Sequence, residues 1–225
     1  MSIQQLLARC PDLWQGRVAL DLAPAGVPTG FAALDLELPW GGWPPGSLSE
    51  LLAARPGDGL GLVLPALARL SAQLSARPRW LLLVDPPLQP FAPALAARGV
   101  GLERLVVVSA GEQRAWAAEQ GLRSGACAAV LLWGGRWDAT TLRRLQLAAA
   151  TGAALAFLFR DPRAARHPSP AALRLALQPA PAGYRVTVLK QRGGRAGAVL
   201  SLPCAGAVAR EEEDCPQMNA NNPVE

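Results

Sequence analysis

Short, mainly apolar runs alternate with segments of helical periodicity through most of this chain, from residue 47 to residue 159. Such runs are typical of strands that are buried on both faces of a sheet. Strands that alternate with helices predict βαβ units and a mostly parallel sheet with helices on both faces. The sequence therefore indicates an α/β fold, with strands expected at 47–53, 80–85, 105–109, 128–133 and 153–159 and helices at 62–77, 90–98, 112–123 and 138–150.

The pattern changes after residue 159. A Pro- and Arg-rich loop at 160–170 leads to three β-like segments with short connections, which predict an antiparallel C-terminal extension of the sheet. These segments are expected at 173–177, 184–191 and 198–202.

The composition fits one domain. With 225 residues and 51% hydrophobic content, the chain can bury one sizeable core. We expect this core at 26–203, between an N-terminal helical segment at 1–25 and an acidic tail at 204–225, whose polar, Asn- and Pro-rich composition predicts disorder. Charges interrupt the first 25 residues, which therefore lack a signal pattern. No apolar run approaches the ~20 residues of a membrane span, so we expect a cytoplasmic protein.

Cysteine and histidine are too few and too scattered to predict a metal site. The four cysteines form no C-x-x-C pair, and His167 is the only histidine, which argues against a Cys/His zinc site. We expect reduced thiols, with Cys127 as a small core residue and His167 in an exposed loop.

A distinctive turn-rich stretch precedes the first expected strand. It reads Gly26-Val27-Pro28-Thr29-Gly30-Phe31, then Leu34-Asp35, then Gly41-Gly42-Trp43-Pro44, then Gly46-Ser47-Leu48-Ser49-Glu50-Leu51-Leu52. This order resembles the entry to the core of RecA-type ATPases, in which the next loop holds the phosphates of ATP. The resemblance implies a RecA-like fold.

The loop that follows lacks the groups that such a site needs. A phosphate loop uses glycines whose N–H groups face the phosphates, a Lys for the β/γ oxygens and a Ser or Thr for magnesium. The corresponding residues keep glycines but offer only an arginine, which is a poor substitute for a compact ammonium, and an aspartate that would repel phosphate. Lys190, far downstream, is the only lysine. We therefore interpret this segment as a surface turn rather than as a nucleotide-binding loop. The residues of this degenerate phosphate loop are Arg55, Gly57, Asp58, Gly59 and Gly61.

Two further positions of this resemblance have lost their acidic residues. Where RecA-type ATPases carry the glutamate that activates water, this chain reads Asp85-Pro86-Pro87-Leu88. Where a strand should end in the magnesium-binding aspartate, it reads Leu132-Trp133-Gly134. The resemblance implies a degenerate ATPase fold that is not an enzyme and uses neither a cofactor nor a metal.

In detail these motifs are most similar to ImuA, the RecA-like accessory family of bacterial translesion DNA synthesis, which is related to the SulA cell-division inhibitors. The resemblance implies an SOS-induced, mutagenic assembly with an ImuB-like protein, RecA and an error-prone DNA polymerase. The alternative is a SulA-type inhibitor that binds FtsZ, although SulA proteins are shorter and lack the Thr-Gly…Leu-Asp entry.

Charge is unevenly distributed along the chain. Residues 136–195 contain eleven basic side chains against Asp138 and Asp161, whereas residues 196–225 contain Arg210 against five acidic ones. The basic region either contacts the phosphates of nucleic acid or forms a solvated face, and the acidic tail is either a partner peptide or a solvated segment. The candidate contact residues for nucleic acid or a partner are Arg160, Arg163, Arg166, Lys190, Arg192 and Arg195.

Two tryptophans lie in the Gly- and Pro-rich entry stretch. Trp40 and Trp43 either anchor a partner, since tryptophan is common in binding hot spots, or fill the edge of the core.

Overall fold

A computed structural model describes residues 25–73, 79–181 and 183–203 of the chain. The helix expected within the first 25 residues and the acidic tail at 204–225 lie outside these described residues, apart from residue 25.

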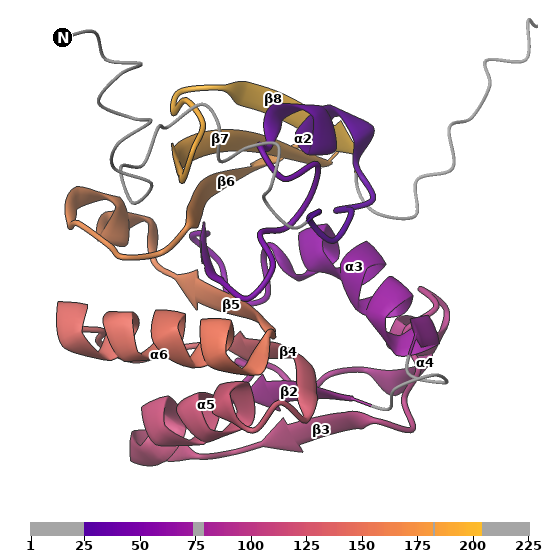
Figure 1. The fold of residues 1–225 in the computed structure, drawn as a ribbon. Helices are drawn as coiled ribbons and strands as arrows, with labels where there is room; N and C mark the ends of the chain where they lie inside the picture. Colours follow the sequence, from indigo (N-terminus) through magenta and orange to yellow (C-terminus); the bar gives the residue numbers. More distant parts are fainter. Residues whose placement is uncertain (1–24, 74–78, 182, 204–225) are drawn as a thin grey trace, which may run out of the picture.

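The centre of the molecule is an eight-stranded sheet with the order β3-β2-β4-β5-β1-β6-β7-β8 (Figure 1). The neighbouring pairs from β3 to β6 are parallel, whereas β7 is antiparallel to β6 and β8 is antiparallel to β7. The expected fold class, a mostly parallel sheet with an antiparallel C-terminal extension, is confirmed. The strands are β1 (Leu48–Leu52), β2 (Trp80–Val84), β3 (Leu105–Val108), β4 (Cys127–Leu132), β5 (Leu155–Arg160), β6 (Leu173–Ala180), β7 (Gly183–Gln191) and β8 (Val199–Pro203).

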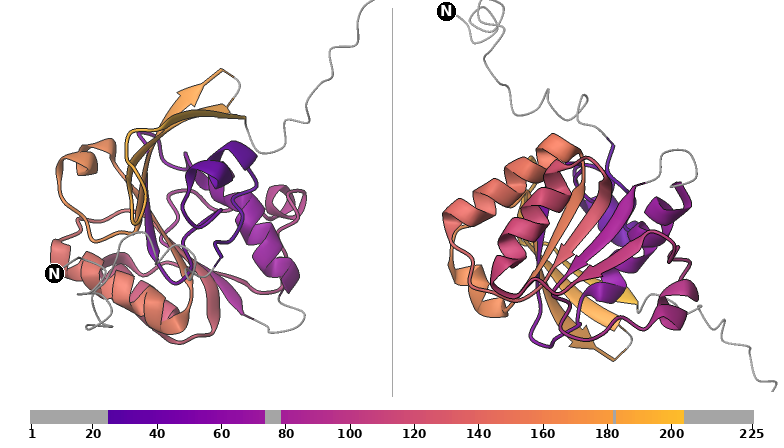
Figure 2. Two further views of the ribbon diagram at one scale, coloured as in Figure 1. Left: turned by 45° about the horizontal axis from the view of Figure 1, so that its top comes forward. Right: turned by 90° about the horizontal axis from the view of Figure 1, so that it is seen from below.

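Helices cover both faces of this sheet (Figures 1 and 2). Apolar residues of α2, α3 and α4 pack on one face in a cluster that includes Leu34 and Leu67. Those of α5 and α6 pack on the other face, in a cluster that includes Leu122 and Leu145. The helices are α2 (Ala32–Glu37), α3 (Leu60–Gln73), α4 (Ala92–Ala96), α5 (Arg114–Arg123) and α6 (Ala139–Gly152), with 3-10 turns η2 (Gly111–Gln113) and η3 (Pro162–Arg166).

The start of α6 follows from its sequence. Asp138 is the N-cap residue, and its carboxylate accepts the backbone N–H of Thr141. This hydrogen bond lowers the pKa of Asp138 below its ordinary value.

Two elements near the entry stretch differ from the sequence-based expectation. A short helix, α2, forms where only turns were expected. Helix α3 begins at Leu60 rather than Leu62, which places Pro65 in the second helical turn instead of the first. A proline there cannot donate to the carbonyl one turn earlier. Its ring instead packs against Gly30, where a Cβ would collide with the Pro65 side chain.

The entry stretch is a packed structural unit. The hydroxyl of Thr29 accepts the N–H of Phe31 at 3.1 Å, and the carboxylate of Asp35 accepts the N–H of Thr29 at 2.8 Å. Val27 pairs with Trp43 in an isolated antiparallel bridge. These contacts hold α2 against the core, so the Thr-Gly…Leu-Asp pattern has a clear packing role in this protein.

Within the described residues, no helix combines the length and apolar character that a membrane crossing requires.

Candidate functional site

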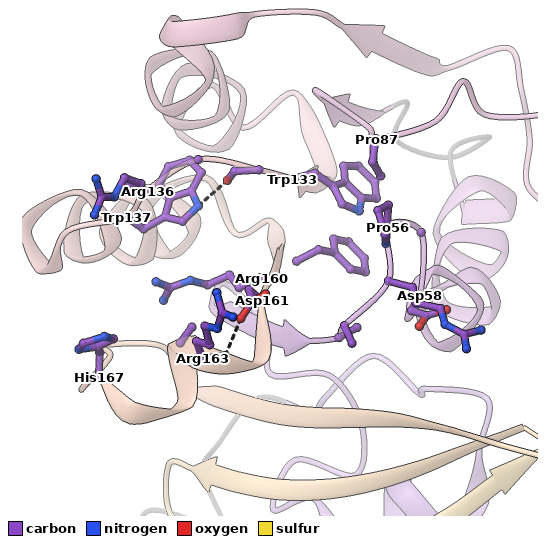
Figure 3. A pocket seen from close by; sticks show the side chains of 18 residues that line it. Pro56, Asp58, Pro87, Trp133, Arg136, Trp137, Arg160, Asp161, Arg163 and His167 are labelled. Carbon is purple, nitrogen blue, oxygen red and sulfur yellow. Dashed lines mark hydrogen bonds between the residues drawn. The ribbon is translucent and has the colours of Figure 1, made fainter.

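The carboxyl ends of β1, β4 and β5 meet at one edge of the sheet, where the loops that follow them enclose a pocket of about 750 Å³ (Figure 3). In open α/β sheets this edge is where ligands bind. The lining comes from the loop 53–58, from Pro87, from residues 133–137 and from the segment that begins at Phe159 and ends at His167.

Hydrogen bonds within the loop after β1 and the first turn of α3 engage several backbone N–H groups. The N–H groups of Asp58, Leu60 and Leu62 donate to the carbonyls of Arg55, Gly57 and Gly59, at 3.1, 3.3 and 3.0 Å. A phosphate-binding loop must instead point such groups at its ligand. The expected degenerate loop therefore folds as a series of turns that continue into α3.

One glycine of the loop lies against the core. Gly59 has φ +87°, and a Cβ there would come within 2.7 Å of Leu177 and 3.4 Å of Phe159. A larger residue would therefore be excluded both by the backbone conformation and by the lack of space.

Two stacked aromatic rings form the floor of the pocket. Trp133 follows β4, and Phe159 lies near the end of β5; their ring centroids are 4.6 Å apart and their planes differ by 5°. Both side chains are buried. The indole Nε1 of Trp133 is also buried and finds no hydrogen-bond partner among the described residues.

The rim of the pocket is cationic. Arg136 and Arg163 lie on one side of it, and the loop that carries Arg55 and Asp58 lies on the other (Figure 3). Arg55, Arg136 and Arg163 are exposed, and none of them takes part in the ion pairs formed within the described ranges. These three guanidinium groups can therefore bind an anion without breaking an existing ion pair.

The carboxylates near the pocket have different surroundings. Asp161 lines the pocket and caps η3, where its Oδ1 accepts the N–H of Arg163 at 2.8 Å. Asp58 also lines it, and its buried Oδ2 lacks a hydrogen-bond partner within the part of the chain that the structure describes.

Asp85, which directly follows β2, forms its contacts away from the pocket. It has an unusual φ of +49°, its Oδ1 accepts the N–H groups of Ala110 and Gly111, and its Oδ2 pairs with Arg114 at 3.0 Å. It is absent from the pocket lining, to which Pro87 contributes instead. The carboxylate of Asp85 thus joins the end of β2 to the turn before α5.

Beside the pocket, a fully buried carboxylate holds two arginines. Glu50 in β1 pairs with Arg174 at 2.7 Å and with Arg160 at 3.0 Å, and it accepts the hydroxyl of Ser169 at 2.7 Å. Arg174 also donates to the carbonyls of Ala164 and His167. This network fixes η3, and with it Arg163, at the pocket.

The structure separates the basic residues that are close in sequence. Arg160 and Arg163 line the pocket, whereas Arg166 is exposed on η3 and does not. Lys190, Arg192 and Arg195 lie at or beyond the end of β7, at the opposite edge of the sheet, because β7 runs antiparallel to β6. The six residues therefore do not form one contact surface.

Lys190 is held in place at that opposite edge. Its Nζ donates to the carbonyl of Ser169 at 2.6 Å. Burial, followed by the charges of Arg174 and Arg192, lowers the pKa of Lys190.

The two entry tryptophans have different environments. Trp43 is fully buried and packs edge-to-face on Phe157, with ring centroids 4.9 Å apart. Its interpretation as a partner anchor is therefore wrong in this fold, and it fills the core instead. Trp40 is half-buried, and its partner role stays a prediction. Cys127 is buried as expected, and burial raises the pKa of its thiol.

Sequence reasoning did not single out Phe159, Arg136 or Trp137 as site residues. Arg136 and Trp137 follow the Gly134-Gly135 pair directly after β4. A glycine pair at the carboxyl end of a parallel strand, followed by an arginine and a tryptophan, was a signal that could have revealed them.

The sheet order, with helices on both faces, defines an α/β fold of the RecA-like kind, and one solved structure has a similar fold. The chain is similar to the crystal structure of the RadB recombinase with a TM-score of 0.59 and 14% identity, over 77% of this chain and 93% of that one. It is also similar to the crystal structure of SulA from Pseudomonas aeruginosa, with 29% identity and a TM-score of 0.42, over 50% of this chain and 96% of that one. No protein-family model and no curated protein matches the chain.

Proposed function

We propose that this protein is a non-catalytic, RecA-like accessory factor of the DNA-damage response that acts through protein contacts. The partners suggested by its resemblance to ImuA are an ImuB-like protein, RecA and an error-prone DNA polymerase in translesion synthesis. The RecA-like fold would supply the rigid surface on which these partners assemble.

The pocket at the carboxyl edge is the observation that carries the proposal. The loop after β1 and the first turn of α3 direct three N–H groups to carbonyls of the loop, and the floor is a stacked pair of aromatic rings. An indole cannot bind magnesium, and no lysine is available to the loop because Lys190 lies at the opposite edge of the sheet. These features support a role that does not depend on ATP hydrolysis.

Calorimetry with ATP and magnesium tests the non-catalytic part. We expect no saturable heat when ATP is titrated into the full chain, with or without magnesium, and no release of phosphate. Tight, magnesium-dependent binding would contradict the proposal, since Trp133 stands where the resemblance expects the magnesium ligand and N–H groups of the loop are bound to its own carbonyls.

Affinity capture tests the partners. The immobilised full chain should retain purified RecA and a purified ImuB-like protein, and the GTP-dependent sedimentation of FtsZ should be unchanged by its addition. If the chain retains neither RecA nor the ImuB-like protein, the proposal is wrong. Loss of sedimentable FtsZ polymer would support the division-inhibitor alternative in its place.

A further inference from the structure

The pocket at the carboxyl edge is suited to an anionic occupant. Arg55, Arg136 and Arg163 surround it without ion-pair partners within the described ranges. Hydrogen bonds between guanidinium and carboxylate are about twice as strong as neutral ones. An acidic segment that enters the pocket would therefore gain several such contacts at once.

The two carboxylates in the lining decide where negative charge is best placed. Asp58 belongs to the loop on one side, whereas Arg136 and Arg163 lie on the other side (Figure 3). Asp161 is engaged with the N–H of Arg163 as the cap of η3. A carboxylate-rich ligand should therefore lie along Arg136 and Arg163, close to the half-buried indole of Trp137.

The chain leaves the described fold at the same edge. β8 runs in the direction of β1, because β7 and β8 are each antiparallel to the preceding strand. Near its end Leu202 pairs with Tyr184, whose hydroxyl lies 3.8 Å from the Cβ position of Gly61 in the first turn of α3. The exit at Pro203 is thus close to the loop that lines the pocket.

The sequence beyond Pro203 supplies a matching acidic segment. Residues 211–214 read Glu-Glu-Glu-Asp. The eight residues from Pro203 to Glu211 can span about 26 Å when extended, at about 3.3 Å per residue. Arg163 and Arg136 follow β5 and β4, which lie four and five interstrand spacings of about 4.8 Å from β8, or about 19 and 24 Å across the sheet. The segment can therefore reach the pocket.

We propose that the acidic segment 211–214 occupies the pocket of its own chain, pairs with Arg136 and Arg163, and thereby masks these arginines from other anions. Tethering favours this occupant over a free one, because short linkers give effective concentrations on the order of millimolar. The proposal goes beyond the function proposed above, since it concerns the isolated chain and needs no partner.

A fluorophore on Cys215, the residue after the acidic segment, tests the proposal. In the full chain with Cys10→Ser and Cys204→Ser, a thiol-reactive bimane should label Cys215 selectively, because Cys127 is buried. Tryptophan quenches bimane at short range, so the emission should be quenched and should recover in Trp137→Phe. It should also recover in about 1 M NaCl, where the Debye length is about 3 Å.

Charge variants separate the proposed contact from a general effect. Arg136→Glu with Arg163→Glu, and in a second protein E211Q/E212Q/E213Q/D214N, should each abolish the quenching. Arg143→Glu is the matched control, since Arg143 is exposed on α6 and does not line the pocket, and it should leave the quenching intact.

The tail variant and the salt titration leave the pocket sequence unchanged, so they decide the question even where the arginine variant does not fold. Emission that is indifferent to Trp137→Phe overturns the proposal. So does quenching that grows with protein concentration, which would place the tail in another copy. Neither result bears on capture of RecA, so the proposed function is tested separately.

Discussion

At the scale of single residues, Glu50 has the largest number of side-chain partners among the carboxylates beside the pocket. Its carboxylate is fully buried in β1, and it binds the guanidinium groups of Arg160 and Arg174, whose side chains are 12% and 7% exposed. Removing one member of a buried ion network is costly, because the remaining charges stay desolvated without a partner. Two arginines depend on this one carboxylate.

We expect Glu50→Gln to destabilise the protein by about 3–5 kcal/mol, the usual cost of breaking a buried ion pair. Urea denaturation followed by circular dichroism measures the effect. Glu119→Gln is the comparison, since Glu119 also joins two arginines and is itself 11% exposed, but the arginine side chains are 57% and 60% exposed. Their charges stay in water when the carboxylate is lost, so the cost should be about 1 kcal/mol, near that of surface pairs. Equal losses for the two variants would show that burial is not what makes Glu50 important.

The sequence could not have revealed the partners of Glu50. The carboxylate lies 110 and 124 residues from Arg160 and Arg174, and only the parallel pairing of β1 with β5 and β6 brings them together. The same limitation applies to Trp43, for which the sequence left both a partner contact and a place at the edge of the core open. Its contact with Phe157 is a property of the folded chain.

At the scale of elements, the buried strands were the most predictable part. β1 to β5 begin and end within one or two residues of their expected positions, because a short apolar run between polar residues leaves little choice for the bounds of a buried strand. Residues 179 and 180 were expected in a connection but belong to β6. Helix α2 has six residues and a single buried side chain, Leu34, so it shows no helical periodicity. Its stability comes from tertiary contacts, which a local pattern does not report.

The close approach of α5 and α6 depends on one glycine. Gly152, in the last turn of α6, lies so near the carbonyl of Leu122 in α5 that an added Cβ would collide with this backbone oxygen. Backbone atoms cannot move aside as the tip of a side chain can. Any larger residue must therefore separate the two helices.

We expect Gly152→Ala to cost about 3 kcal/mol, at the upper end of overpacking changes. Gly125→Ala is the comparison, because Gly125 has a left-handed φ of +68° but open space around its Cβ position, and its cost should be only the conformational penalty of about 1–2 kcal/mol. Chemical denaturation of both variants gives the two values. A smaller loss for Gly152→Ala than for Gly125→Ala would contradict the packing argument.

At the scale of the whole molecule, charge was the property that sequence reasoning placed least well. The basic region 136–195 is continuous in sequence, yet its members lie at the pocket, in the buried network of Glu50, on α6 and at the opposite edge of the sheet. Sheet topology causes this division, since β7 returns antiparallel and carries Lys190 and Arg192 away from Arg163. Net charge along the chain therefore did not predict a single nucleic-acid surface.

Whether residues 26–203 form one cooperative domain is also a question about the whole molecule. The two apolar clusters lie on opposite faces of one sheet and share its strands, so loosening one should unfold the other. Leu34 lies in the first cluster and Leu145 in the second, and both are fully buried or nearly so. Leu34→Ala and Leu145→Ala should each lower the free energy of unfolding by about 2–5 kcal/mol.

In both variants the unfolding curves from circular dichroism and tryptophan fluorescence should coincide, as a two-state transition requires. The slope with urea should stay unchanged, because each variant still exposes the surface of the whole domain on unfolding. The neighbouring leucines supply controls, since Leu36 on α2 is 89% exposed and Leu147 on α6 is 61% exposed, and their replacement should change stability by no more than about 0.5 kcal/mol. Two separate transitions in either core variant would mean that the faces unfold independently and that the single-domain assignment is wrong.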